Sequence, residues 1–134
     1  MSSKKLLIVE DDADVRLGYR VLLQAHHYQT CFAEDAALAL SVARKELPDL
    51  IILDLGLPAG DGFVVLERLA NVAELRSIPV IVVSARDHRN NEERALEAGA
   101  RAYMQKPWDD DSLLALISHL LGEPAISKAS ARYS

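Results

Sequence analysis

Five polar residues of this chain stand where short apolar runs end, and their types suit the transfer of a phosphoryl group. They are Glu10, Asp11, Asp54, Ser84 and Lys106. A carboxylate such as that of Asp54 can attack phosphorus as a covalent nucleophile. The transition state spreads negative charge over the phosphoryl oxygens, and an ammonium or hydroxyl group can stabilise that charge. We therefore predict that Asp54 accepts a phosphoryl group, with Lys106 and Ser84 beside it.

The three carboxylates also have the chemistry of a metal site. Two full charges about 4 Å apart repel by about 4 kcal/mol at an effective dielectric of about 20. Such a cluster persists if a pKa rises, if a cation bridges the acids, or if Lys106 offsets part of the charge. Oxygen ligands with no His or Cys pattern nearby favour a hard cation, Mg²⁺ before Ca²⁺ or Mn²⁺. We expect Mg²⁺ as the cofactor.

Strands and helices must alternate to bring these residues together. The apolar runs are short, uninterrupted and partly β-branched, which is typical of strands buried on both faces of a parallel sheet. We expect strands at 6–9, 50–53 and 80–83, with less regular ones at 28–32 and 102–104. Helical periodicity predicts helices at about 14–25, 35–46, 62–70, 90–98 and 109–121.

This order predicts an α/β protein with a doubly wound, flavodoxin-like (βα)5 fold. Its five parallel strands would have the order 2-1-3-4-5. Ligands of such sheets bind beyond the carboxyl ends of the strands, at the point where the strand order reverses. That crevice lies between the first and third strands, so Glu10, Asp11 and Asp54 should meet there.

The helices have recognisable ends and apolar faces. Asp12 is expected to cap the first helix, and Gly99 and Gly122 to end the last two. The first helix is expected to bury Val15, Leu17, Val21, Leu22 and Ala25, and the second Ala36, Leu40, Ala43 and Leu47.

Composition narrows the class of protein. The net charge of −5 argues against a nucleic-acid-binding surface, which needs clustered basic residues. No apolar run approaches the roughly 20 residues that cross a bilayer, and the run at 6–9 is too short for a secretory signal. Cys31 is the only cysteine, so an intrachain disulfide is impossible and we expect a cytoplasmic location. We expect one domain at 1–122 and a tail or the start of a linker at 123–134.

Taken jointly, these motifs resemble the receiver domains of two-component response regulators. The similarity covers about residues 4–121. It includes the apolar run with its acids at 6–12 and the loop at 54–62. The later landmarks Val83-Ser84-Ala85, Gly99-Ala100 and Lys106-Pro107 follow in the family's order and spacing.

The resemblance implies a role for each site residue. Asp54 is the phosphoacceptor, and Glu10 and Asp11 form the acidic pocket for Mg²⁺, with the backbone carbonyl of Gly56 as a further ligand. Lys106 contacts the phosphoryl group. Ser84 and Tyr103 are the hydroxyl and aromatic switch residues. The family also implies a cis peptide bond between Lys106 and Pro107.

Two positions that vary within the family are expected to modulate the site. Gly56 has no side chain to shield an acyl phosphate from water. Arg86 brings a cation to the rim. We hypothesise that Gly56 leaves room for attacking water and that Arg86 stabilises the bound phosphoryl group.

The predicted function is a phosphate-operated signalling switch that is not an enzyme in its own right. The expected phosphodonor is a histidine kinase or a histidine phosphotransfer protein. The expected target is an output domain or effector protein, through the surface of the fourth helix, fifth strand and fifth helix. A homodimer on phosphorylation is possible, and contact with nucleic acid or membrane is not expected. The alternatives are a phosphorylation-independent scaffold, and a small metal-dependent phosphatase or flavin-binding protein.

Overall fold

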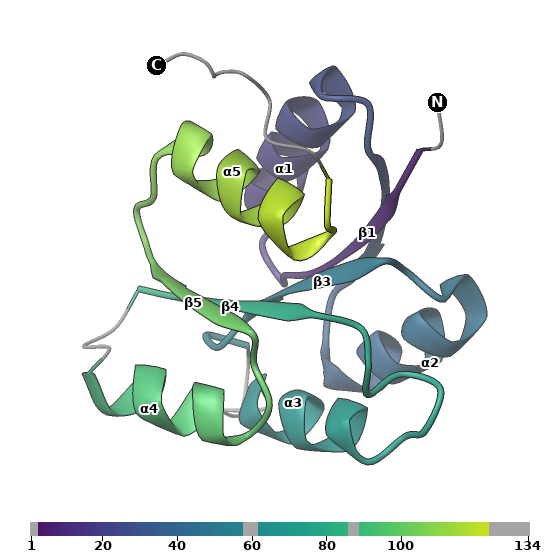
Figure 1. The fold of residues 1–134 in the computed structure, drawn as a ribbon, viewed down its shortest axis with the longest axis vertical. Coiled ribbons are helices and arrows are strands. Elements are labelled where there is room, and N and C mark those ends of the chain that lie inside the picture. Colours follow the sequence, from purple (N-terminus) through teal and green to yellow (C-terminus); the bar gives the residue numbers. More distant parts are fainter. Residues whose placement is uncertain (1–2, 58–61, 86–88, 124–134) are drawn as a thin grey trace.

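The apolar runs form a single parallel sheet. The computed structural model describes residues 3–57, 62–85 and 89–123 (Figure 1). Its strands are β1 (Lys5–Val9), β2 (Gln29–Ala33), β3 (Leu50–Asp54), β4 (Val80–Ser84) and β5 (Ala102–Gln105). All neighbouring strands are parallel, in the order β2-β1-β3-β4-β5. The predicted fold class and strand order are therefore confirmed, including the two less regular strands.

Five helices connect the strands and follow the predicted ranges closely. They are α1 (Ala13–Ala25), α2 (Ala36–Glu46), α3 (Gly62–Ala70), α4 (Arg89–Glu97) and α5 (Asp110–Leu120). Side-chain carboxylates of Asp12, Asp35 and Asp109 accept backbone N–H groups at the starts of α1, α2 and α5. Each such cap stabilises its helix by about 1 kcal/mol, because the first N–H groups have no partner within the helix.

A glycine follows the last turn of both α4 and α5, as the sequence predicts. Gly99 has φ +115° and Gly122 has φ +71°, values that L side chains rarely adopt. No helix within 3–57, 62–85 and 89–123 is long and apolar enough to cross a bilayer.

The sheet separates two apolar cores because successive strand residues point to opposite faces. Helices α1 and α5 cover one face and α2, α3 and α4 cover the other (Figure 1). Leu6, Ile8, Leu50 and Ile52 belong to the core beneath α1 and α5. Leu7, Val9, Ile51 and Leu53 belong to the core on the other face.

The apolar face predicted for α1 was wrong, because the helix buries a different side around its axis. Leu17 and Val21 are 55% and 63% exposed, whereas the buried residues of α1 are Tyr19 and Leu23. The helix packs along the line through these two residues, one turn apart, and Val15 and Leu22 flank that line. The prediction followed the apolar residues Leu17 and Val21 and therefore left out both Tyr19 and Leu23.

The apolar face predicted for α2 was also wrong at one position. Leu47 is 56% exposed. It lies just beyond the last turn, at φ +45°, and this left-handed backbone turns the chain out of the helix.

Candidate functional site

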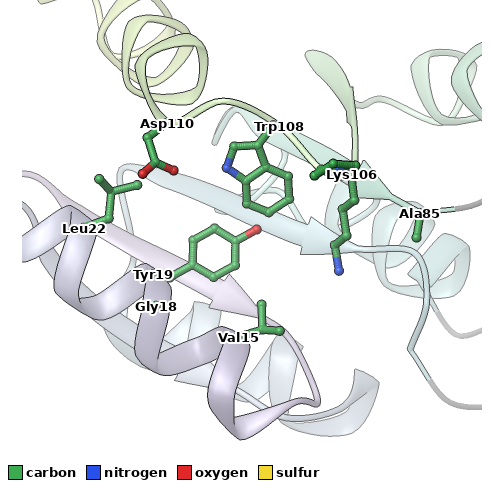
Figure 2. A pocket seen from close by; sticks show the side chains of 9 residues that line it. Val15, Gly18, Tyr19, Leu22, Ala85, Lys106, Trp108 and Asp110 are labelled. Atoms are coloured by element: carbon green, nitrogen blue, oxygen red, sulfur yellow. The ribbon is translucent and has the colours of Figure 1, made fainter.

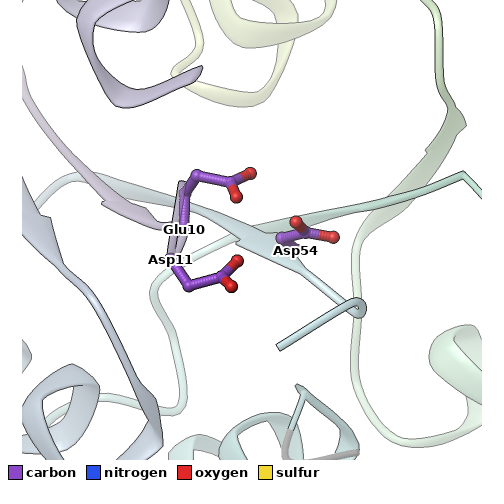
Figure 3. Close-up of side chains that lie close together, drawn as sticks. All are labelled: Glu10, Asp11 and Asp54. Carbon is purple, nitrogen blue, oxygen red and sulfur yellow. The ribbon is translucent and has the colours of Figure 1, made fainter. Parts of the chain in front are cut away.

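Three carboxylates lie together at the carboxyl ends of β1 and β3. These neighbouring strands are in register, with Val9 opposite Leu53, so the residues that follow or end them meet. One carboxylate oxygen from each of Glu10, Asp11 and Asp54 lies within 4.8 Å of the others (Figure 3). The sequence prediction that these acids meet is confirmed.

Burial differs among the three acids. Glu10 and Asp54 are 2% and 6% exposed, whereas Asp11 is open to solvent. Burial, and then the neighbouring Asp54 carboxyl, raise the pKa of Glu10 to about 7, although the Asp12 N–H and Lys106 oppose the shift. The sequence left open whether a raised pKa, a cation or Lys106 relieves the repulsion, and the structure shows two of these at once.

Lys106 supplies the positive charge of the site from just beyond the end of β5. Its Nζ donates hydrogen bonds to Asp54 Oδ2 at 3.0 Å and to Glu10 Oε1 at 3.4 Å. Partial burial alone would lower the pKa of Lys106, but the hydrogen bond to Asp54 and the two negative charges outweigh it and raise the pKa. The amine therefore stays charged.

A backbone hydrogen bond fixes the position of the Lys106 main chain. The Lys106 N–H donates to the Ser84 carbonyl at 2.8 Å, which extends the pairing of β4 and β5 by one residue. The peptide bond between Lys106 and Pro107 is cis, as the resemblance implied.

The loop after β3 holds the Asp54 carboxylate in place. The Gly56 N–H donates to Asp54 Oδ1 at 2.8 Å. A Cβ added to Gly56 would lie 3.3 Å from the same oxygen, which is tighter than most contacts of real Cβ atoms. Gly56 therefore leaves space beside Asp54, as the sequence predicted. The hydrogen bond from its backbone was not predicted, because a backbone donor leaves no signature in residue type.

Two contacts to Glu10 were also missed at the sequence level. The Asp12 N–H donates to Glu10 Oε2 at 3.1 Å, and Arg16 Nη1 donates to the Glu10 carbonyl at 2.8 Å. Together they fix the turn between β1 and α1. Each contact involves a backbone group, and residue type gives no signal for it.

Ser84 and Tyr103 lie on neighbouring strands on the face covered by α2, α3 and α4. Ser84 ends β4 and is 2% exposed. Tyr103 lies on β5, opposite Val82 of β4, and packs against the core of that face. Strand alternation puts Ser84 on the same face as Val82. Their switch roles stay predictions. Arg86 lies outside the described residues.

The donor set fits a hard divalent cation. It consists of three carboxylates with no imidazole or thiolate, and it supplies fewer ligands than an octahedral ion needs, as is usual for Mg²⁺. The backbone carbonyl of Gly56 is the further ligand expected from the sequence.

Comparison with known proteins agrees with this geometry. The family model described as the response regulator receiver domain matches residues 6–118. The chain is 39% identical to the response regulator PleD of Caulobacter vibrioides over 88% of its own length and 26% of PleD. It is 32% identical to the protein PilH of Pseudomonas aeruginosa, over 87% of this chain and 97% of PilH.

Solved structures show the same fold. A putative response regulator from Chloroflexus aurantiacus superposes with a TM-score of 0.85 at 28% identity, over 91% of this chain and 100% of that one. A CheY-like receiver domain protein from Methanospirillum hungatei gives a TM-score of 0.83 at 29% identity, over 90% and 95% of the two chains.

Proposed function

Because this chain belongs to the response regulator receiver family, we propose that Asp54 is the phosphoacceptor of a two-component signalling switch. One observation supports this most directly. A nearly buried carboxylate at a strand end lies within hydrogen-bond distance of the Lys106 amine and within 4.8 Å of two further acids. That is the charge arrangement phosphoryl transfer requires.

The proposed transfer starts from a phosphohistidine of a histidine kinase or histidine phosphotransfer protein. An Asp54 carboxylate oxygen attacks phosphorus, forming an O–P bond while the N–P bond breaks. The leaving imidazole nitrogen keeps the electron pair and takes up a proton. Lys106 holds one face of the transferring group with its fixed positive charge, and the Ser84 hydroxyl is a donor for another of its oxygens.

Glu10, Asp11, Asp54 and the Gly56 carbonyl are the residues proposed to hold Mg²⁺. When bound there, the cation would neutralise charge that develops on the phosphoryl oxygens. The all-oxygen donor set supports this choice. Without a metal ion, Lys106 is the only cation among the described residues that pairs with Glu10 and Asp54.

The proposed output is a change in the surface formed by α4, β5 and α5. Ser84 moves toward the new phosphoryl group, and Tyr103 fills the space that it leaves on the same sheet face. Phosphorylation thereby stabilises one of two existing conformations. Moving the population from 1:99 to 99:1 needs about 5.5 kcal/mol of differential stabilisation.

We propose that an output domain or effector protein responds to that change. We also propose that phosphorylation favours a homodimer. We propose residues 1–122 as the receiver domain and 123–134 as a tail or linker, acting in the cytoplasm. The chain spans about a quarter of PleD but nearly all of PilH. Its relatives therefore include a protein of about its own length and a much longer one.

The phosphorylation-independent scaffold is the second candidate, but no observation favours it, since the acids and the acceptor lie together and the lysine pairs with Asp54. A phosphatase or flavin-binding protein has even less support. A cavity of about 630 Å³ beside Lys106 is mostly apolar, and residues of α1 and of the segment 106–110 line it rather than the three acids.

The test is phosphorylation by a small phosphodonor with Mg²⁺, followed by mass spectrometry and acid treatment. The wild type should gain one acid-labile phosphoryl group and Asp54→Asn none. Asp35→Asn is the control, because Asp35 is not one of the clustered acids and an asparagine at the start of α2 still caps the helix. Uptake that persists in Asp54→Asn, or that never occurs in the wild type, would refute the assignment.

A further inference from the structure

Tyr19 is a buried polar residue that the proposed reaction does not yet use. It is 4% exposed and lies on the inward side of α1. Its hydroxyl is fully enclosed and has no hydrogen-bond partner among the residues that the structure describes. Buried hydroxyl groups are nearly always paired, because an unpaired one loses its hydration without compensation. An exception beside a functional site calls for an explanation.

The ring of Tyr19 is held in one orientation. It stacks on Trp108 with centroids 5.5 Å apart and planes inclined by 24°. Trp108 follows the Lys106–Pro107 segment, and both rings line the apolar cavity between α1 and the start of α5 (Figure 2). Figure 2 shows the hydroxyl end of Tyr19 turned toward the Lys106 side chain. The stacking therefore determines where the hydroxyl points.

The hydroxyl lies on the same side of the sheet as the reacting groups. Tyr19 belongs to the core that contains Leu6, Ile8, Leu50 and Ile52. Strand alternation puts the next residues of the same parity, Glu10 and Asp54, on that face as well. Burial, and then the negative charges of Glu10 and Asp54, raise the pKa of Tyr19 far above its usual value, so the phenol remains a donor.

The Glu10 carboxylate can accept a hydrogen bond from the Tyr19 hydroxyl. Its Oε2 accepts the Asp12 N–H at 3.1 Å, and its Oε1 accepts from Lys106 over a longer distance of 3.4 Å. In the proposed reaction the Lys106 amine must also serve the phosphoryl group on the acceptor. Glu10 Oε1 would then lose its donor while remaining buried.

We propose that Tyr19 is a positioning residue whose hydroxyl donates to the Glu10 carboxylate once the Lys106 amine has turned to the phosphoryl group. For this contact the Glu10 side chain must rotate so that its carboxylate meets the Tyr19 hydroxyl. The new hydrogen bond keeps Glu10 oriented as a metal ligand in the phosphorylated state, as outer hydrogen bonds do at other metal sites. This inference rests on the proposed phosphorylation of Asp54.

The experiment uses Tyr19→Phe, which keeps the ring and removes only the hydroxyl. The readouts are Mg²⁺ affinity with and without beryllofluoride, a phosphoryl mimic, followed by fluorescence of Trp108, the single tryptophan of the chain. Affinity for Mg²⁺ alone should stay within about twofold, whereas affinity in the presence of beryllofluoride should fall about tenfold. In thermal unfolding without ligands the variant should be at least as stable as the wild type, because it buries no unpaired hydroxyl.

Tyr28→Phe is the matched control. It removes a phenol hydroxyl that donates to Glu123 at 2.8 Å, and Tyr28 lies at the α1–β2 turn, away from the acids. It should leave both affinities unchanged. Equal affinities for Tyr19→Phe and wild type under both conditions would overturn the proposal, and so would an equal loss under both. A wild type that does not respond to beryllofluoride would instead refute the proposed phosphorylation itself.

Discussion

The Lys106 amine lies 3.0 Å from Asp54 Oδ2, although 52 positions separate the two residues in the chain. The same amine is 3.4 Å from Glu10, 96 positions away. One flexible side chain thus connects the end of β5 to the ends of β1 and β3. The partly buried amine is the only cation paired with these acids among the described residues.

Replacing Lys106 by methionine should weaken both the reaction and the metal-free fold. Methionine keeps an unbranched apolar side chain but leaves two buried carboxylates without their cation. We expect phosphorylation by a small phosphodonor to slow at least tenfold, since a charge stabiliser of the transition state is lost. We expect the free energy of unfolding without Mg²⁺ to fall by about 1–2 kcal/mol, less than for a fully buried pair. Denaturant titration and phosphorylation kinetics measure the two effects.

Lys5→Met is the control for this substitution. Lys5 pairs with Glu46 at 2.8 Å on the surface, where ion pairs contribute little. It should change neither the phosphorylation rate nor, by more than about 0.5 kcal/mol, the stability. Equal behaviour of the two variants would show that the Lys106 contacts have no special role.

Replacing Gly56 by asparagine should lengthen the lifetime of the phosphorylated form. A Cβ at this position would lie 3.3 Å from Asp54 Oδ1, so the new side chain must crowd the acceptor and obstruct an attacking water. We expect the lifetime, measured by loss of acid-labile phosphate, to rise several-fold. Gly18→Asn is the control, because a Cβ at the exposed Gly18 meets nothing within 4 Å. An unchanged lifetime in Gly56→Asn would remove the proposed role of the glycine.

Arg86→Ala tests the companion hypothesis that this cation stabilises the phosphoryl group.

The Cys31 thiol should react slowly with alkylating reagents in the folded protein. Burial is the main cause that raises its pKa to about 11. A thiol is reactive only after losing its proton, so a raised pKa lowers the reactive fraction at any pH below it. At pH 8 we expect alkylation on the order of a hundredfold slower than for an unfolded chain with a thiol pKa of about 8.5.

The pH profile provides the sharper test of Cys31. The alkylation rate should rise about tenfold per pH unit from about pH 7 to about pH 10, because the thiol stays mostly protonated throughout. A plateau at about pH 9 would contradict the raised pKa. The same measurement in denaturant supplies the reference for the unfolded chain.

The sequence alone determined the elements and the set of reacting groups. The runs 6–9, 50–53 and 80–83 are short and entirely apolar, as is typical of buried strands, and a polar residue follows each of them. Once alternation of strands and helices fixes a parallel sheet, Glu10 and Asp54 must leave its carboxyl edge side by side. These features depend on near neighbours in the chain, so residue type and spacing reveal them.

Only the tertiary structure decided which groups touch. Leu17 looks like a core residue of α1 by hydrophobicity, but the helix is rotated so that Tyr19 is buried and stacks on Trp108. The reach of Lys106 to two acids, and the Gly56 N–H at Asp54, likewise depend on how distant segments pack. Helix rotation and side-chain reach are set by the fit of whole surfaces, and no local pattern of residues records that fit.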